Sequence, residues 1–382
     1  MDDYISPWMT EELAMLQDAA GKFFEREFSA HEEQWADEGI MPREMWNKAG
    51  KAGLLCASIP KKYGGAGGTF AHETVILYEQ GRANVRSLGN GVHSGIVAHY
   101  INAYGSKEQK EKWLPKMATG ELVGGIAMTE PGSGSDLQSV RTTAKLEGNQ
   151  YEINGQKTFI TNGQHANLMI VVAKTNQEEK ARGISLIVVE VDEVEGYTKG
   201  RNLKKLGLQA QDTSELFFDR VRVPTANLLG DQEGQGFFQL MNQLPQERLI
   251  IGIGACSAMD HAIKLATQYV KERKAFGKSI MDFQNTRFKL AECKTEAHIA
   301  RVFVDNCLMR HLEGNLDVTT AAMVKWWCSQ KQNEVIDECL QLFGGYGFMD
   351  EYPISRMYAD ARVQKIYGGT NEIMKELIAR SL

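Results

Sequence analysis

Tyr-Glu-Ile-Asn-Gly-Gln-Lys-Thr-Phe-Ile-Thr, residues 151–161, is the stretch that decides the fold class of this chain. An Asn154-Gly155 pair stands in it between two short runs that contain β-branched and aromatic residues. Asn-Gly is the strongest short-range signal for a two-residue turn between antiparallel strands. The stretch therefore predicts a β-hairpin, with strands at 151–153 and 157–161 that turn at Asn154-Gly155.

Further short strands are predicted on both sides of this hairpin. Each is an apolar, β-branched or aromatic run that ends at a turn signal or a proline. The predicted strands are 140–146, which ends at Glu147-Gly148-Asn149, then 168–173, 184–191, and 215–223, which Pro224 stops. No helical pattern alternates with them, so residues 124–235 are predicted to form a β-barrel or sandwich and not a parallel βαβ sheet.

Helical patterns flank this predicted β domain. In residues 1–123, Thr10 and Ser106 stand where helix N-caps are expected. In residues 236–382, apolar residues recur at steps of three and four, as on one face of a long helix, at 290, 293, 297, 300, 304 and 307, and 321–342 is a second such stretch. The chain is therefore predicted to be a multi-domain α+β protein, with an N-terminal helical domain (1–123), a middle β domain (124–235) and a C-terminal helical domain (236–382).

Composition excludes several classes of protein. The 382 residues carry a net charge of -6, which disfavours nucleic-acid binding because that needs a basic face. The eight histidines form no His-Glu-x-x-His motif and the six cysteines no Cys-x-x-Cys pair, so no metal site is predicted. The cysteines are expected to be buried, reduced thiols.

The start of the chain and its apolar runs bear on location. Met1-Asp2-Asp3-Tyr4 has neither a secretory signal pattern nor an Arg-rich transit pattern. No apolar run was expected to reach the length of a membrane span, so no integral membrane segment is predicted. The predicted location is the cytoplasm, or the mitochondrial matrix if a transit peptide has been removed.

One glycine pattern has only a superficial likeness to a nucleotide-binding motif. Gly252-Ile253-Gly254 lacks a third glycine and a preceding strand, and it falls inside a helical pattern. A Rossmann fingerprint is therefore rejected, and no P-loop sequence is present.

Five other segments carry the chemistry. The first, 126–136, is a strand that ends in a Pro-Gly-Ser-Gly-Ser loop, whose N–H groups and hydroxyls suit a pyrophosphate or a flavin edge. Alone it is as compatible with a plain Gly/Ser turn. The others are Phe-Ile-Thr-Asn-Gly (159–163), Arg-Lys-Ala-Phe-Gly (273–277), Gln-Leu-Phe-Gly-Gly (341–345) and Tyr-Gly-Gly-Thr-Asn-Glu (367–372).

In this order and spacing the five segments resemble the acyl-CoA dehydrogenase family, nearest to its long-chain branch, over essentially the whole chain. The resemblance implies a C-terminal four-helix bundle, a homotetramer, and FAD held between the β domain and the bundle. It implies cofactor contacts from Ile126, Met128, Thr129, Gly134, Ser135, Phe159, Ile160, Thr161, Arg273, Phe276, Gln284, Gln341, Gly344, Gly345, Thr370, Asn371 and Glu372. The Arg273 to Gly345 members would reach FAD across a subunit contact. It implies substrate contacts from Ser135, Phe238, Pro245, Arg248, Gly368 and Gly369.

One position departs from the common pattern of the family. Most members carry their catalytic Glu directly after the Tyr of a Tyr-Glu-Gly-Thr segment, and here that position is Gly368. In the long-chain and isovaleryl branches the base instead precedes an Arg on the first helix of the C-terminal domain, as Glu247 precedes Arg248. A first-turn helix acid after Pro245 is the plain alternative for Glu247. Glu372 is a rival carboxylate that ranks below Glu247.

The implied activity is FAD-dependent oxidation of acyl-CoA thioesters, of medium to long straight chain, to trans-2-enoyl-CoA in fatty-acid β-oxidation. Electrons would pass to an electron-transferring flavoprotein. An acyl-CoA oxidase and a branched-chain, isovaleryl-type dehydrogenase are the alternative enzymes. Some relatives of this fold bind DNA, but they carry a basic extension that this acidic chain lacks.

Overall fold

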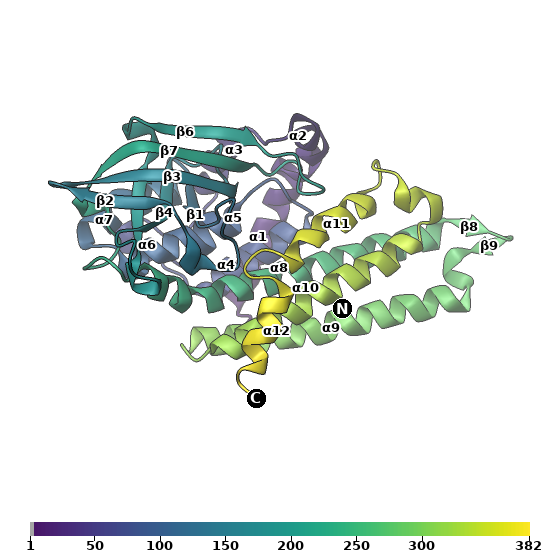
Figure 1. Ribbon diagram of the computed structural model, residues 1–382. Coiled ribbons are helices and arrows are strands. Elements are labelled where there is room, and N and C mark those ends of the chain that lie inside the picture. Colours follow the sequence, from purple (N-terminus) through teal and green to yellow (C-terminus); the bar gives the residue numbers. More distant parts are fainter. Residues whose placement is uncertain (1–3) are drawn as a thin grey trace.

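The computed structural model describes residues 4–382, and its chain runs through a helical part, a β part and a second helical part (Figure 1). The N-terminal helices are α1 (Glu11–Glu27), α2 (Glu32–Glu38), α3 (Glu44–Lys51), α4 (Phe70–Arg82), α5 (Asn90–Val92), α6 (Ala98–Tyr104) and α7 (Lys107–Ala118). A π-helical turn, His93–Val97, joins α5 to α6. This arrangement confirms the predicted fold class.

Caps predicted from the sequence begin two of these helices. The hydroxyl of Thr10 accepts a hydrogen bond from the N–H of Leu13 at the start of α1. Ser106 and Gln109 form a capping box at the start of α7, each side chain bonding to the backbone of the other. These bonds satisfy N–H groups that a helix start otherwise leaves without partners.

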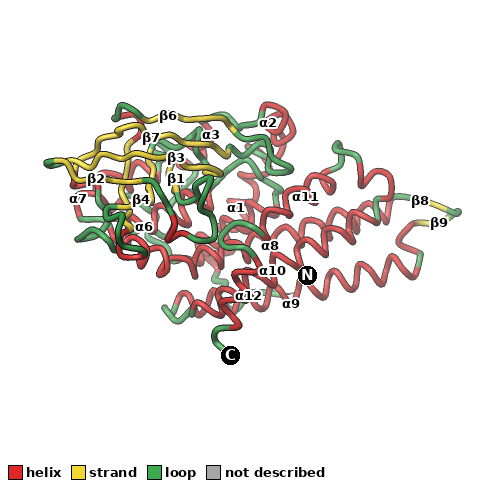
Figure 2. The backbone as a smooth tube through the Cα atoms, viewed as in Figure 1, coloured by secondary structure: helices red, strands yellow, loops and turns green. Residues whose placement is uncertain are grey.

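The middle part is one curled sheet of seven strands, drawn as yellow tube in Figure 2. The strands are β1 (Gly124–Ala127), β2 (Thr143–Glu147), β3 (Gln150–Thr161), β4 (Leu168–Lys174), β5 (Ile184–Glu190), β6 (Tyr197–Asn202) and β7 (Thr213–Pro224). Their order is β1-β4-β2-β3-β7-β6, with β5 paired to β4. Most pairings are antiparallel, but β1 and β2 each pair with β4 in parallel.

The predicted hairpin at Asn154-Gly155 is wrong. Residues 150–161 form the single strand β3, and the turn of the hairpin is Gly148-Asn149, between Glu147 of β2 and Gln150 of β3. Asn154-Gly155 is instead a bulge, where the register against β7 shifts. Gly155 has φ +153, and a Cβ there would lie 2.8 Å from Cα of Thr142. Close backbone approach therefore explains the glycine, as it does at many bulges.

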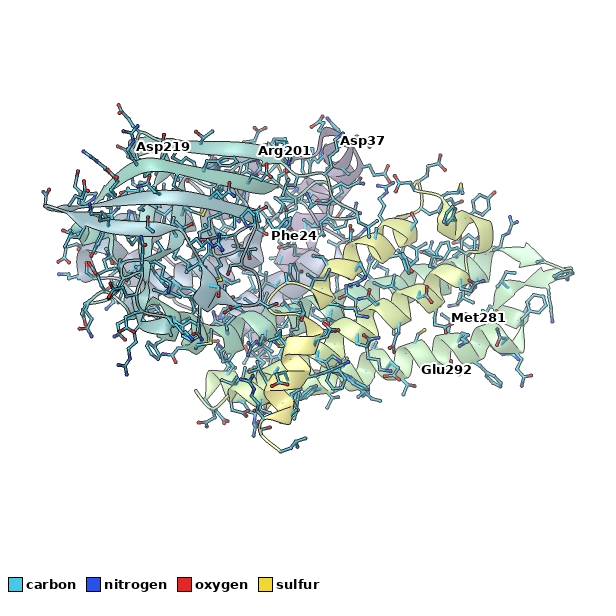
Figure 3. All side chains as sticks on the ribbon, viewed as in Figure 1. Phe24, Asp37, Arg201, Asp219, Met281 and Glu292 are labelled. Atoms are coloured by element: carbon cyan, nitrogen blue, oxygen red, sulfur yellow. The ribbon has the colours of Figure 1, made fainter. Side chains whose placement is uncertain are left out.

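Long helices form the C-terminal part: α8 (Gly236–Glu272), α9 (Gln284–Leu312), α10 (Val318–Gln341), α11 (Pro353–Ala361) and α12 (Asn371–Ala379). A short hairpin, β8 (Lys274–Ala275) and β9 (Lys278–Ser279), joins α8 to α9. The helices α8, α9 and α10 pack on one another, and α11 and α12 pack on α10. Figure 3 shows the molecule as elongated, with Arg201 and Asp219 on the β part and Met281 and Glu292 toward the far end of the helices.

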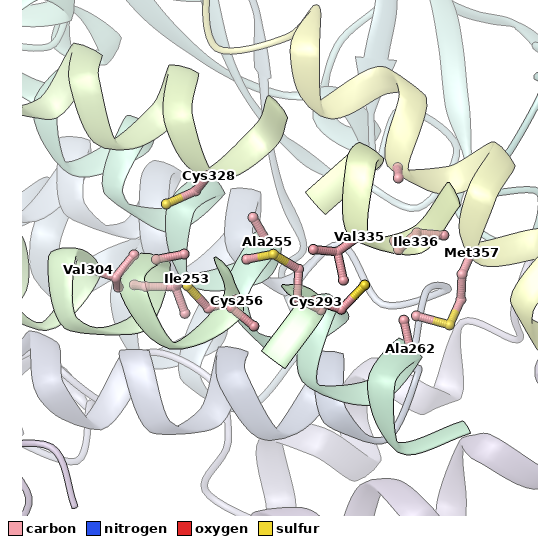
Figure 4. Packing of buried hydrophobic residues seen from close by; sticks show 14 of the residues in the cluster. Ile253, Ala255, Cys256, Ala262, Cys293, Val304, Cys328, Val335, Ile336 and Met357 are labelled. Carbon is pink, nitrogen blue, oxygen red and sulfur yellow. The ribbon is translucent and has the colours of Figure 1, made fainter. Parts of the chain in front are cut away.

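The helical period predicted for 290–307 is confirmed, because each apolar residue on that face of α9 is buried. Cys256 of α8 and Cys293 of α9 lie in this core beside Ile253, Val304 and Val335 (Figure 4). All six cysteines are free and buried, as predicted. Small side chains at these positions let the helix axes come close together.

By length and hydropathy alone, α8 could cross a membrane, since one 18-residue window has a mean hydropathy of 1.4, contrary to the expectation from the sequence. However, 56% of that window is buried inside the protein. There α8 packs against α4, α9 and α10, as the central helix of a multi-helix core does.

Candidate active site

A cavity of about 380 Å³ lies where the three parts of the chain meet. The β part contributes the ends of β1 and β3, the N-terminal part contributes α4, α5 and the π-helical turn, and the C-terminal part contributes α8, α10 and the segment before α12. The predicted site residues that line it are Ile126, Met128, Thr129, Phe159, Ile160, Thr161, Glu247 and Gly368. The fold therefore brings together residues that are up to 242 positions apart in sequence, from Ile126 to Gly368.

A buried ion pair holds the β side of the cavity. Lys157, on β3, has no exposed surface, and its Nζ donates to Oε1 of Glu130 at 2.9 Å and to the carbonyl of Met128 at 3.0 Å. Glu130 also accepts from the N–H of Arg141 at 2.6 Å and of Thr142 at 2.9 Å. These bonds fix the loop on both sides of Thr129 to the neighbouring strands.

Two residues at the end of β3 have left-handed backbone. Phe159 has φ +59 and Asn162 has φ +64. The Asn162 amide donates to the carbonyls of Gly89 and Gly124, so it joins the N-terminal part to β1. The Phe159 ring stays 67% exposed while the residue lines the cavity. Such backbone is unfavourable for a bulky residue, and strain of this kind is concentrated at functional sites.

Glu247 lies on the α8 wall of the cavity and is only 7% exposed. The hydroxyl of Tyr100, on α6, donates to its Oε1 at 2.8 Å. Burial raises the pKa of Glu247 to about 7, against the opposing effects of the Tyr100 hydrogen bond and the Arg248 charge. A carboxyl group with a pKa near neutrality is suited to act as a general base at neutral pH.

Glu247 is not a first-turn acid, so that alternative is wrong. The helix begins at Gly236 and runs unbroken through Pro245. Beside Glu247, the amide of Gln246 donates to the carbonyl of Gly95 at 2.7 Å. Gly95 belongs to the π-helical turn, so this bond joins α8 to the segment that forms the opposite wall.

Gly368 lies on the same cavity as Glu247 and has φ +63. The carbonyl of the next residue, Gly369, accepts a hydrogen bond at 2.7 Å from Nζ of Lys325, a fully buried residue of α10. Arg248 is buried too, and in the described part of the chain its Nε and Nη1 have no hydrogen-bond partner. Lys325 thus lies buried against this glycine turn, and Arg248 is near enough to Lys325 to lower its pKa.

The rival Glu372 is placed differently. It is exposed in the first turn of α12, and a hydrogen bond to its own backbone lowers its pKa. Thr370 caps the same helix by accepting from the N–H of Ile373, and Asn371 is buried against Lys325. None of the three lines the cavity, and neither do Gly134, Ser135, Phe238, Pro245, Arg248 and Gly369.

A third group of predicted residues lies at the far end of the helices, where Figure 1 shows the β8–β9 hairpin away from the sheet. The group comprises Arg273, Phe276, Gln284, Gln341, Gly344 and Gly345. The Phe276 ring is 95% exposed, and the Arg273 guanidinium lies 5.7 Å from the ring centre of Tyr346. One chain therefore does not bring this group to the cavity.

Sequence reasoning missed four residues of the site. Tyr100, Lys157, Ile250 and Lys325 are not among the residues predicted for the site. A lysine inside an apolar run, as Lys325 is between Val324 and Trp326, was the one available signal.

A buried carboxyl with a pKa near neutrality, beside a cavity at a domain junction, is the arrangement expected of an enzyme that removes a proton from its ligand. Comparison with known proteins gives the class: residues 10–121, 125–221 and 234–382 match the N-terminal, middle and C-terminal domains of acyl-CoA dehydrogenase. The chain belongs to the acyl-CoA dehydrogenase family of oxidoreductases.

The relatives are similar over nearly their full length. The mitochondrial long-chain specific acyl-CoA dehydrogenase of Mus musculus is 51% identical over 96% of this chain and 86% of its own. The crystal structure of acyl-CoA dehydrogenase from Geobacillus kaustophilus has a TM-score of 0.96 at 48% identity, covering 99% of both chains. A glutaryl-CoA dehydrogenase from Mycobacterium smegmatis, in complex with FADH2, has a TM-score of 0.91 at 26% identity over 98% of this chain and 95% of its own.

Proposed function

We propose that this protein oxidises acyl-CoA thioesters of medium to long straight chain to trans-2-enoyl-CoA, with FAD as cofactor and Glu247 as the base. The observation that carries the proposal is the buried Glu247 on a cavity it shares with Gly368. Gly368 occupies the position where most of the family, by resemblance, has its base, and it has no side chain to take a proton. Two carboxylates line the cavity, Glu247 and Asp360, and because Asp360 is paired with Arg86 at 3.1 Å, Glu247 is the better candidate for the base.

The proposed chemistry removes two hydrogens from neighbouring carbons. Oε of Glu247 takes the α-proton, the electrons of the broken Cα–H bond form the Cα–Cβ double bond, and a hydride leaves the β-carbon. The α-proton becomes acidic enough only when the thioester oxygen is hydrogen-bonded as it gains charge. Within residues 4–382 the backbone N–H of Gly368 has no main-chain acceptor, which supports its use as one such donor.

The residues present fit a flavin. The β side of the cavity combines the apolar Ile126, Met128 and Ile160 with the hydroxyls of Thr129 and Thr161. A flavin ring has the matching character, with a flat apolar body and polar edges. When bound there, FAD would supply the acceptor for the β-hydride. Thr129 and Thr161 would hold its edge, and the Lys157–Glu130 pair would keep Thr129 in place.

The distant group around Arg273 and Phe276 supports a further part of the proposal, a homotetramer in which these residues contact the FAD of a neighbouring subunit. Apolar residues exposed on α9 favour such assembly, among them Phe288, Ile299, Val302 and Met309. We also propose that β1 and α8 begin the middle and C-terminal domains, at residues 124 and 236. An electron-transferring flavoprotein as acceptor, and a cytoplasmic or mitochondrial location, complete the proposal.

The decisive experiment compares Glu247→Gln with Glu372→Gln in FAD-loaded protein. Anaerobic stopped flow with straight-chain acyl-CoAs follows the loss of flavin absorbance. We expect Glu247→Gln to bind FAD and lose roughly 10²–10⁴-fold in rate, as removal of a general base does. Glu372→Gln should reduce nearly normally. Near-normal reduction by Glu247→Gln would reject Glu247 as the base.

The same preparation distinguishes the alternative enzymes. An oxidase would release hydrogen peroxide on aerobic turnover, whereas a dehydrogenase would need an added electron acceptor. Isovaleryl-CoA as the substrate with the highest kcat/KM would replace the straight-chain assignment with a branched-chain one.

A further inference from the structure

Lys325 is the one lysine of α10 with no exposed surface. Taking an ammonium group out of water is costly unless its donors are satisfied. Its Nζ donates to the carbonyl of Gly369 at 2.7 Å and to Oδ1 of Asn371 at 2.9 Å. Both acceptors are neutral, so no carboxylate in these contacts balances the charge. A neutral donor could make the same two hydrogen bonds at a lower desolvation cost, so a purely structural role does not explain an ammonium group here.

A second buried cation, Arg248, lies near Lys325. Burial and, to a smaller extent, the charge of Arg248 on α8 lower the pKa of Lys325 to about 8, and the exposed Glu372 of α12 opposes them. The Nε and Nη1 of Arg248 are themselves without partners in the described part of the chain. Lys325 is therefore a buried cation next to the Gly368–Gly369 turn, and a second buried cation, Arg248, lies near enough to act on it. Such a region favours an anion at the part of the cavity that Gly368 lines.

Lys325 holds the Gly368–Gly369 turn in place. Gly368 and Gly369 both have left-handed backbone, at φ +63 and +91, which is intrinsically mobile in glycine. Lys325 holds the carbonyl of Gly369, and Ser329, one turn further along α10, donates to the same Oδ1 of Asn371 at 3.1 Å. α10 thereby holds the turn at Gly369 and the start of α12 at Asn371.

We propose that Lys325 is a positioning residue: it holds the Gly368–Gly369 turn against the cavity and, with Arg248, supplies positive charge that stabilises an enolate forming beside Glu247. This inference rests on the proposed function, since it concerns the thioester whose α-proton Glu247 removes. Lys325 does not line the cavity, so it acts through the turn and through space.

The test uses acetoacetyl-CoA, a 1,3-dicarbonyl ligand whose enolate is detected by absorbance. The apparent pKa of the bound ligand is measured in FAD-loaded wild type, Lys325→Met, Lys325→Gln and Lys325→Arg. We expect the pKa to rise by about 1 unit or more in the Met and Gln variants, and to stay within about 0.5 unit in the Arg variant. The rate of flavin reduction by acyl-CoA should fall roughly 10–100-fold with KM changed less than about threefold.

Lys331→Met is the matched control, because Lys331 lies on the same helix but pairs with Glu296 and Glu334 near the surface. It should leave the enolate pKa unchanged. Lys325→Gln keeps one donor without the charge, and it carries the test if the Met variant does not fold. An enolate pKa that is unchanged in the Gln variant, while wild type oxidises acyl-CoA, would overturn the role of Lys325 alone. Wild type that oxidises no acyl-CoA would instead overturn the proposed function.

Discussion

The hydroxyl of Tyr100 is the hydrogen-bond donor to Oε1 of Glu247, over 2.8 Å, and it links the N-terminal helices to the C-terminal ones. Both side chains are buried. Burial and the nearby Glu247 raise the pKa of Tyr100, so it remains a protonated donor at neutral pH. A donor aimed at a carboxylate stabilises its charged form, so Tyr100 opposes the effect of burial on Glu247.

Tyr100→Phe should therefore raise the pKa of Glu247 further. A hydrogen bond to a charged group contributes about 1.5–3 kcal/mol, and 1.36 kcal/mol corresponds to one pKa unit, so a shift of about 1 unit is expected. The measurement is the pH profile of the flavin reduction rate, whose rise with pH should move upward by that amount. Tyr104→Phe, which alters the neighbouring ring without a bond to Glu247, is the control. A profile unchanged by Tyr100→Phe would contradict the role of this hydroxyl.

The free energy of unfolding should also depend on the protonation state of Glu247. Its pKa is raised in the folded state from 4.5 to about 7, so the folded protein binds this proton more tightly than the unfolded chain. The resulting stabilisation is complete below pH 4.5 and is lost as pH rises through 7. Glu247→Gln, which is never ionised, should exceed wild type by about 1–3 kcal/mol at pH 8 and match it near pH 4. Urea unfolding of the protein at both pH values measures this, and an equal difference at the two would contradict it.

The fold class could be predicted from the sequence because hydrophobic period and turn chemistry are local signals. Helical patterns come first along the chain, then strand patterns and then helical patterns again, and this order separates the three parts. The misplaced hairpin shows the limit of local signals. Asn-Gly favours a turn whatever surrounds it, so the pair alone does not reveal the tertiary contacts that decide its conformation. Here the packing of Thr142 against Gly155 and the pairing with β7 turn the same two residues into a bulge.

Residues of the site could be predicted only where they belong to a short sequence motif. Thr129 follows β1, Phe159 and Thr161 lie at the end of β3, and the structure brings these three residues of recognisable segments to one cavity. Tyr100 and Lys325 lie 147 positions before and 78 after Glu247, counting from their numbers, and nothing local marks what they touch. The role proposed for the Arg273 group requires a second subunit, because one chain places this group away from the cavity (Figure 1).

Restoring a carboxylate at the usual family position should fail. In Gly368→Glu on a Glu247→Gln background, the new Cβ would come within 2.4 Å of Cδ1 of Ile251, so the end of that side chain would have to move. The residue would also have to keep a left-handed φ of +63, which costs about 1–2 kcal/mol for a non-glycine residue. We expect a less stable protein with little recovery of flavin reduction, measured by stopped flow and thermal unfolding. Recovery to more than about a tenth of wild-type rate would show that this turn adapts more easily than its contacts imply.

We expect the part of the cavity that Gly254 lines to limit the length of the acyl chain. A Cβ built at Gly254 of α8 would meet nothing within 4 Å, and the residue lines the cavity two turns beyond Glu247. Gly254→Leu should therefore fill open space and shorten the preferred acyl chain, while the gain in helix propensity over glycine, about 0.8–1 kcal/mol, keeps the fold stable.

Gly252→Ala is the matched control on the same helix, because its Cβ would face Val324 at 3.1 Å and Val304 at 3.3 Å, inside the helix core and away from the cavity. The measurement is kcat/KM over a panel of straight-chain acyl-CoAs from short to long. Gly254→Leu should lower kcat/KM for long chains by roughly tenfold or more, since lost burial costs about 0.8 kcal/mol for each methylene, and should leave short chains nearly unchanged. Gly252→Ala should affect all lengths alike, through stability alone. A uniform loss in Gly254→Leu would place the acyl chain elsewhere than beside this glycine.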